Sequence, residues 1–164
     1  MKIRQNIYNI VAIVFMMDQF IKILIQRNME LYKEIIMIPN FFSLYYVKNT
    51  GAAFSILEDA TLLLIVISVV FILLIDRTIK KEEKNLDKLS IISIGIILGG
   101  IFGNLMDRIL YHSVIDYLSF SFGKYHFPVF NLADIGITIG VFLLLIDMVK
   151  EKKNKTKGGD KNDK

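Results

Sequence analysis

The amino-acid sequence predicts a membrane protein of the all-α class, in which a bundle of four transmembrane helices carries a small β-sheet region outside the membrane. Three observations support this prediction. Of the 164 residues, 54% are hydrophobic, whereas soluble domains usually contain about 45–50%. Long apolar runs alternate with short blocks of charge. The chain contains no cysteine, which excludes disulfide scaffolds, Cys-based metal sites and thiol nucleophiles.

Four apolar segments predict the transmembrane helices, at residues 7–25, 61–75, 89–106 and 132–149. A helix needs about 20 residues to cross the hydrocarbon core of a bilayer. The second segment is the shortest, so we expect its helix to begin earlier, near Ser55. In the third, Gly99 and Gly103 have the small-xxx-small spacing that lets a helix pack closely against a neighbour.

The distribution of positive charge predicts the orientation in the membrane. Fourteen of the 20 Lys and Arg residues lie before the first helix, between the second and third, and after the fourth. The positive-inside rule then places both termini in the cytoplasm. The first helix is retained rather than cleaved as a signal peptide, because Asp18 and Lys22 interrupt its apolar run. Residues 1–149 form a single domain, and residues 150–164 are expected to be a disordered basic tail.

Two loops, at residues 26–60 and 107–131, lie on the opposite side of the membrane from the termini. The aromatic and β-branched run at 41–47 predicts a strand, and Asn49-Thr50-Gly51 predicts a turn. The second loop is also rich in aromatic residues, with Gly123 and Pro128 at turns. Because aromatic side chains favour the membrane interface, we expect a small sheet on the outer leaflet.

Charged residues at membrane depth are costly, and they usually face the interior of a bundle and have a function. Asp18 and Lys22 are four residues apart on one helix face and are expected to pair. Asp107 and Arg108 are interpreted as an interfacial ion pair, and Asp147 as an interfacial carboxylate. The two histidines, at positions 112 and 126, are interpreted as loop residues rather than ligands.

Asp116 and Asp134 have no cation beside them in the sequence, and apolar residues flank both. The predicted topology places them at similar depth, at the outer end of the bundle. Two carboxylates in a cleft of low dielectric constant tend to share one proton, so that one can act as a base and the other as an acid. This arrangement would support the chemistry of an aspartic protease.

Three other functions follow from the same residues. A Ser/Lys peptidase would use Lys22 as its base, but no serine is suitably placed. A presenilin-like protease would need a Gly-x-Gly-Asp motif, which the sequence lacks. A proton-coupled carrier could use Asp18, Lys22 and Asp134 as a relay.

The chain resembles the lipoprotein signal peptidases (signal peptidase II) in five motifs that occur in order. They are DQFIK at 18–22, NTGAAF at 49–54, GGIFGNLMDR at 99–108, VIDY at 114–117 and FNLAD at 130–134. The resemblance covers nearly the whole chain before the tail. One departure is Phe127 before Pro128, where many members have Trp or Tyr.

The resemblance implies a multi-pass aspartic peptidase of the bacterial plasma membrane, with its active site near the outer leaflet. Such enzymes remove the signal peptide from diacylglyceryl-modified prolipoproteins, and they cut just before the lipid-modified cysteine. It also implies a β-cradle, a short surface helix, no metal and no other cofactor. The expected partners are these substrates, membrane lipids and globomycin-like peptide inhibitors, without nucleic acid, and the chain is expected to be a monomer.

The resemblance also implies the site residues. The catalytic dyad would be Asp116 and Asp134. The residues that would line or support the site are Asp18, Lys22, Asn49, Gly51, Asn104, Arg108, Asn131 and Ala133.

Overall fold

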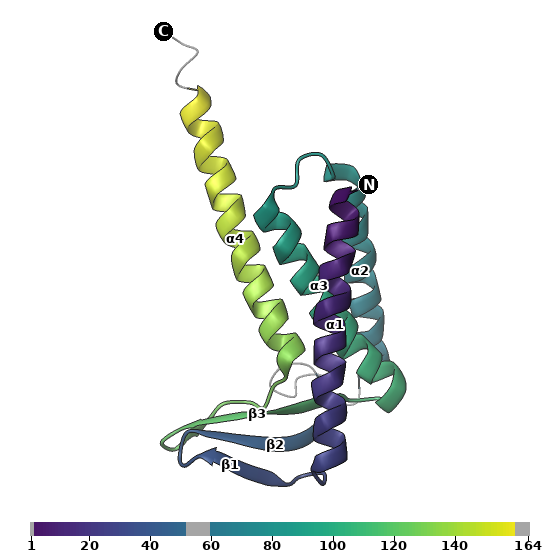
Figure 1. Cartoon of the computed structure of the whole chain (residues 1–164), viewed down its shortest axis with the longest axis vertical. Coiled ribbons are helices and arrows are strands. Elements are labelled where there is room, and N and C mark those ends of the chain that lie inside the picture. The colour runs from purple at the N-terminus through teal and green to yellow at the C-terminus, as the bar shows by residue number, and fades with distance from the viewer. Residues whose placement is uncertain (1, 52–59, 160–164) are drawn as a thin grey trace.

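The computed structural model describes residues 2–51 and 60–159, which form four long helices and one antiparallel sheet (Figure 1). The helices are α1 (Lys2–Asn28), α2 (Thr61–Glu82), α3 (Lys88–Tyr111) and α4 (Leu132–Gly159). The strands are β1 (Glu34–Ile38), β2 (Phe42–Asn49), β3 (Val114–Phe122) and β4 (Tyr125–His126). The sheet lies at one end of the bundle, opposite the end where α1 begins and α4 finishes (Figure 1).

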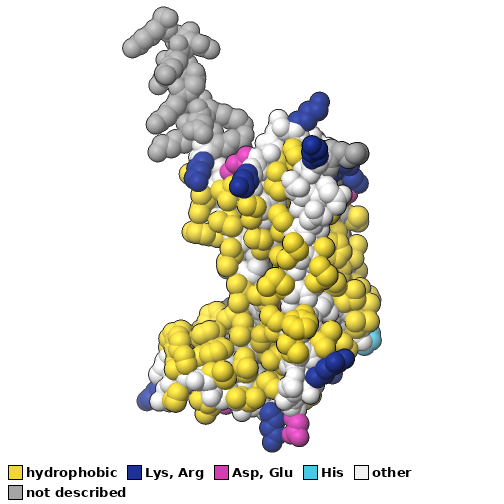
Figure 2. Space-filling view, viewed as in Figure 1, with side chains coloured by type: hydrophobic (Ala, Val, Ile, Leu, Met, Phe, Trp, Pro, Cys, Tyr) yellow, Lys and Arg dark blue, Asp and Glu magenta, His cyan; other side chains and the backbone are white. Residues whose placement is uncertain are grey.

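All four helices are long and apolar enough to cross a membrane, which confirms the predicted count of four. On the face shown in Figure 2, apolar side chains cover the bundle and the adjoining surface of the sheet, whereas Lys and Arg gather toward the two ends. This distribution is typical of a protein surrounded by lipid, where apolar side chains face outward.

The helix ends differ from the predicted boundaries. α1 and α3 continue to Asn28 and Tyr111, so the predicted loops at 26–60 and 107–131 both begin inside helices. α2 begins at Thr61 rather than near Ser55, which lies outside the described residues, and α2 gains its length at the other end, up to Glu82. Lys, Arg and Glu favour helix, so a helix continues where its apolar run stops.

The C-terminal helix shows the same effect. α4 continues ten residues beyond the predicted end at residue 149, to Gly159. The helix therefore extends into the segment predicted as a tail, and the division of the chain at residues 149 and 150 stays a prediction. Residues 160–164 lie outside the described residues.

α3 is the central helix of the bundle. In its most apolar 18-residue window 56% of the residues are buried, against 11–17% in the other three helices. Small residues make this position possible: a Cβ added at Gly99 would lie 2.6 Å from Val14 Cβ, and one at Gly100 would lie 2.6 Å from the carbonyl oxygen of Ala133. α1 and α4 therefore approach the α3 backbone closely, as the small-xxx-small spacing predicts.

The sheet has the strand order β1-β2-β3-β4, and each neighbouring pair is antiparallel. β2 confirms the strand predicted at 41–47. Its pairing with β3 shifts register between Leu44 and Val47, where one extra residue in β2 forms a bulge. His126 lies in β4 rather than in a loop. The described residues contain no further helix that would match the predicted short surface helix.

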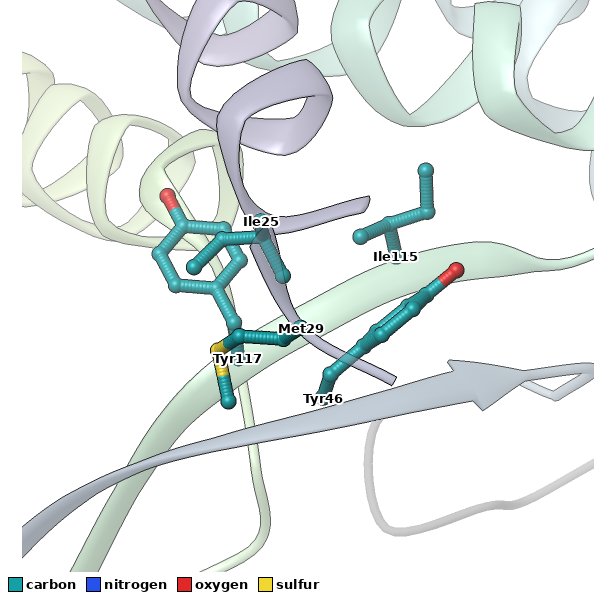
Figure 3. Packing of buried hydrophobic residues seen from close by; sticks show 5 residues of the cluster. All are labelled: Ile25, Met29, Tyr46, Ile115 and Tyr117. Carbon is teal, nitrogen blue, oxygen red and sulfur yellow. The ribbon is translucent and has the colours of Figure 1, made fainter. Parts of the chain in front are cut away.

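A buried apolar cluster fixes the sheet to the end of α1. Ile25 of α1 and Met29, just after the end of α1, pack against Tyr46 of β2 and against Ile115 and Tyr117 of β3 (Figure 3). These β3 residues flank Asp116 in the sequence. The cluster therefore holds the start of β3 at the end of the bundle.

Polar contacts hold the N-terminal end of α3 and join it to α4. The Asp87 side chain caps the helix by accepting a hydrogen bond from the backbone N–H of Ser90, at 2.7 Å. The Ser90 hydroxyl donates to Asp147 of α4. Asp147, interpreted above as an interfacial carboxylate, thus joins α4 to α3.

Candidate active site

Asp116 lies near the start of β3 and is only 2% exposed. It pairs with Val47 on the far side of the β2 bulge. Bulges change the direction in which neighbouring side chains point. Two residues further along β2, Asn49 donates a hydrogen bond from its Nδ2 to Asp116 Oδ2, at 3.0 Å.

Asp134 lies in the first turn of α4, and reciprocal hydrogen bonds with Asn131 hold it there. The backbone N–H of Asp134 donates to Asn131 Oδ1 at 3.0 Å, and the backbone N–H of Asn131 donates to Asp134 Oδ2 at 3.2 Å. This pattern is a capping box, which satisfies N–H groups at the start of a helix that lack partners within it.

Two asparagines connect the carboxylates of Asp116 and Asp134. Asn131 Nδ2 donates to Asp116 Oδ1 at 2.7 Å and to Asn104 Oδ1 at 3.1 Å. Asn104 Nδ2 donates to Asp134 Oδ1 at 2.8 Å. The structure thus places the two predicted dyad residues in one hydrogen-bonded network.

The start of α4 is also held by side chains from other elements. The backbone N–H of Ala133 donates to Asp18 Oδ1 of α1 at 3.0 Å, and that of Leu132 donates to the Tyr117 hydroxyl of β3 at 3.2 Å. Because the first N–H groups of a helix need external acceptors, Asp18 and Tyr117 set where α4 begins. They therefore position Asp134.

Lys22 is a buried cation, 1% exposed, that joins three side chains beneath the two aspartates. Its Nζ lies 2.8 Å from Asp18 Oδ2, which confirms the predicted pair, and 2.8 Å from Asp107 Oδ2. It also donates to Asn104 Oδ1 at 3.0 Å. With its oxygen bound to Lys22, Asn104 turns its amide nitrogen toward Asp134.

Asp107 is not the interfacial partner of Arg108 that we predicted. It is fully buried, paired with Lys22, and accepts hydrogen bonds from Gln19 Nε2 at 2.9 Å and from the backbone N–H of Ile115 at 3.1 Å. Successive residues on a helix point about 100° apart, so Asp107 and Arg108 face different neighbours.

Arg108 instead lies beside the predicted turn at 49–51. Its guanidinium donates to the backbone oxygens of Gly51, at 3.1 Å, and of Asn104, at 3.3 Å. The backbone N–H of Gly51 in turn donates to Asn49 Oδ1 at 2.9 Å, which orients the Asn49 amide. Arg108 Nε is buried and has no hydrogen-bond partner among the described residues.

Both aspartates line a cleft of about 930 Å³ between the sheet and α4. Asn49, Asn104 and Arg108 also line it, and most of the remaining wall is apolar. Burial, and next the charge of Asp134, raise the pKa of Asp116 from 3.8 to about 7. Asp116 can therefore hold a proton near neutral pH, which suits acid–base chemistry.

A family model described as Signal peptidase (SPase) II matches residues 10–150 of the chain. The chain therefore belongs to the signal peptidase II family. A relative from Geobacter sulfurreducens, named lipoprotein signal peptidase, is 40% identical over 159 residues, which cover 94% of this chain and 99% of the relative. Another of that name, from Maridesulfovibrio salexigens, is 38% identical over 146 residues, covering 86% and 93%.

Two solved structures of bacterial membrane enzymes are similar to this signal peptidase II family member. One, determined by the in meso method at 2.3 Å resolution, has a TM-score of 0.80 and 31% identity, and the match covers 89% of this chain and 88% of that one. The other, at 1.9 Å resolution, has a TM-score of 0.75 and 31% identity, covering 86% and 90%.

The structure brings together every residue that the signal peptidase II motifs implied for the site. All ten lie at the junction of the helices and the sheet: Asp18, Lys22, Asn49, Gly51, Asn104, Arg108, Asn131, Ala133, Asp116 and Asp134. The prediction omitted Gln19, Asp107 and Tyr117, which hold these residues in place. Gln19 is a polar residue within a predicted helix, and that signal could have found it. Asp107 directly follows the predicted helix at 89–106 and was therefore interpreted as an interfacial residue.

Proposed function

We propose that this chain is an aspartic endopeptidase that removes the signal peptide from diacylglyceryl-modified prolipoproteins, cutting just before the lipid-modified cysteine. The observation that carries the proposal is the pair of carboxylates, Asp116 and Asp134, joined through Asn131 and Asn104 at the wall of one cleft. The relatives named lipoprotein signal peptidase, which match over most of their length, support the substrate class.

Two carboxyl groups in this network can hydrolyse a peptide bond without a covalent intermediate. One carboxylate takes a proton from water as the oxygen attacks the scissile carbonyl, and the other carboxyl group donates a proton to the carbonyl oxygen. Removing either group from the pair prevents one of these transfers. The family similarity and the shared hydrogen bonds support this mechanism.

Arg108 is suited to hold the peptide beside the dyad. Its guanidinium lines the cleft, is fixed at two backbone oxygens, and has one buried N–H without a partner among the described residues. A buried donor without a partner is costly unless a ligand supplies an acceptor. We infer that a backbone carbonyl of the substrate accepts from Arg108 Nε.

The apolar wall of the cleft suits a substrate that carries acyl chains. Ile135 and Ile139 are one helical turn apart on the cleft side of α4, and Phe127 and Phe130 also line the cleft. Acyl chains bound there would remain beside the hydrocarbon of the membrane while the peptide reaches Asp134 in the first turn of the same helix.

We place the cleft near the outer leaflet of the bacterial plasma membrane and both termini in the cytoplasm. The uneven distribution of Lys and Arg along the chain supports this orientation. We also expect the enzyme to act as a monomer. A globomycin-like peptide should inhibit by occupying the same cleft.

A gel-shift assay on purified components tests this function. The full chain in detergent should shorten a diacylglyceryl-modified prolipoprotein, and sequencing should place the new N-terminus at the lipidated cysteine. The matched control is the same precursor with serine in place of that cysteine, which cannot be lipidated and should remain uncut. Equal cleavage of both precursors, or no cleavage of the lipidated one, would contradict the proposal.

A further inference from the structure

Asp134 occupies a place that favours the ionised carboxylate. It is in the first turn of α4, where the positive end of the helix dipole attracts negative charge. One of its oxygens accepts a backbone N–H, that of Asn131 at 3.2 Å, and the other accepts from Asn104 Nδ2 at 2.8 Å. Its side chain is only partly buried and lines the cleft, where water can solvate it.

Asp116 occupies the opposite kind of place. It is 2% exposed and belongs to a strand rather than to the first turn of a helix. Both of its hydrogen bonds come from neutral side-chain amides, those of Asn49 and Asn131. Burial penalises the charged form of an acid and, with the Asp134 charge, raises the pKa of this group to about 7.

The surrounding charges do not remove this difference, in which the ionised form is favoured more at Asp134 than at Asp116. Arg108 interacts more strongly with Asp134 than with Asp116, and the effect of Lys22 on Asp116 is smaller than that of burial. Lys22 is also bound by two carboxylates of its own. Among the described residues, the charged or titratable groups in the hydrogen-bonded network and the cleft around the pair are Asp18 and Lys22 of α1, Lys48 of β2, Asp107 and Arg108 of α3, and Tyr117 of β3.

We propose that the two aspartates have fixed and different roles: Asp116 carries the proton of the resting pair and is the general acid, and Asp134 is the carboxylate that activates water. This assignment rests on the proposed peptidase function. It deepens that function by giving each carboxyl group one part of the reaction.

The proton transfers then balance over one turnover. Asp134 takes a proton from water as the water oxygen bonds to the scissile carbonyl carbon, while Asp116 gives its proton to the carbonyl oxygen. The resulting gem-diol collapses as the C–N bond breaks. Asp134 passes its proton to the leaving nitrogen, and Asp116 regains a proton from a diol hydroxyl. The products are one carboxylic acid and one amine, and both aspartates return to their starting states.

Titrating each carboxyl group alone tests the assignment, because two interacting groups titrate as a pair. We would label the aspartate carboxyls with ¹³C and follow them by NMR against pH in Asp116→Asn and in Asp134→Asn. The signal absent from the double variant identifies the remaining group. Asp116 in Asp134→Asn should titrate above its ordinary pKa of 3.8 and at a higher pH than the carboxyl group that remains in Asp116→Asn. The reverse order, or equal midpoints, would overturn the assignment.

A second measurement uses an enzyme that retains both carboxyls. Asn49 donates to Asp116, so Asn49→Ala removes a donor that stabilises the Asp116 carboxylate. In the pH profile of kcat/KM, the basic limit should move to higher pH while the acidic limit stays. Movement of the acidic limit alone, of both limits together, or of neither contradicts the assignment. Because the NMR titration needs no cleavage, failure of the proposed function would remain distinguishable from failure of this inference.

Discussion

At the scale of single residues, Lys22 holds the polar interior of the bundle together. Its ammonium group neutralises part of the charge of Asp18 and Asp107 and orients the Asn104 amide. Asp18 supports the start of α4, and Asp107 accepts the backbone N–H of the residue before Asp116. One buried cation therefore supports both halves of the proposed dyad.

Replacing Lys22 should be strongly destabilising. Lys22→Met leaves two buried carboxylates without their cation, and removing one partner from a buried ion pair typically costs about 3–5 kcal/mol. The matched control is Lys80→Met, because Lys80 makes an exposed pair with Asp76 at 2.6 Å. Such a pair contributes about 1 kcal/mol or less. Thermal unfolding in detergent should separate the two variants, and equal losses of stability would contradict this role for Lys22.

The raised pKa of Asp116 also predicts how stability depends on pH. Between 3.8, its ordinary pKa, and about 7, the folded protein keeps a proton at Asp116 that the unfolded chain releases. The stabilising contribution of this group is therefore complete below pH 3.8 and is lost as pH rises through about 7. Each pKa unit of difference corresponds to about 1.4 kcal/mol.

Asp116→Asn removes this pH dependence. The stability of the variant relative to wild type should therefore be higher at pH 8 than at pH 5. Unfolding curves in detergent at the two pH values would measure the difference. If the free energy of unfolding changed equally between the two pH values in wild type and variant, Asp116 would ionise in the folded protein at its ordinary pKa.

The ion-pair partner of Asp107 could not be predicted from the sequence. A neighbouring cation in the sequence suggested a local pair with Arg108, but the turn of the helix directs Asp107 toward α1 and Lys22. The Asp18–Lys22 pair was predictable because both partners lie on one helix. The Lys22–Asp107 pair was not, because it depends on how α1 packs against α3.

At the scale of elements, the glycines of α3 set how closely α1 and α4 approach it. Gly99→Ala would place a methyl group 2.6 Å from Val14 Cβ of α1, so the helices must separate. Overpacking of this kind costs about 1–3 kcal/mol. Gly136→Ala is the control, because its methyl group would meet no atom closer than 3.4 Å. Gly99→Ala should lower the thermal midpoint and the cleavage rate, whereas Gly136→Ala should change both little; similar effects would contradict the packing argument.

The elements also show which boundaries the sequence can predict. The four apolar runs gave the number of helices, because their hydropathy depends only on local composition. The helix ends were missed, since Arg77, Lys80 and Lys81 are unfavourable in lipid but favourable in helix, and α2 continues through them. Hydropathy therefore indicates where a helix leaves the hydrocarbon, and not where the helix ends.

At the scale of the whole molecule, the proposed orientation can be tested because the natural chain contains no cysteine. Lys124→Cys introduces a thiol between β3 and β4, and Lys152→Cys introduces one near the end of α4. A membrane-impermeant maleimide should label the first in intact bacterial cells and the second only after permeabilisation. The opposite pattern would show that the chain is inserted the other way round.

The proposed site is a property of the whole molecule, since α1, β2, α3, β3 and α4 each supply at least one of its residues. The motifs identified ten of these residues through the family resemblance. Residue chemistry alone singled out Asp116 and Asp134 but could not supply the hydrogen bonds that join them. Those bonds require Asn131 and Asn104, which are 27 positions apart, to meet at the start of α4.

The most direct test of the central claim is cleavage by purified Asp116→Asn and Asp134→Asn. Asparagine is nearly isosteric with aspartate, so both variants should insert and fold, as thermal unfolding can verify. With a chemically lipidated precursor as substrate, each variant should lose all detectable turnover, because each lacks one carboxyl group that must exchange a proton. Normal cleavage by either variant would contradict the aspartic mechanism.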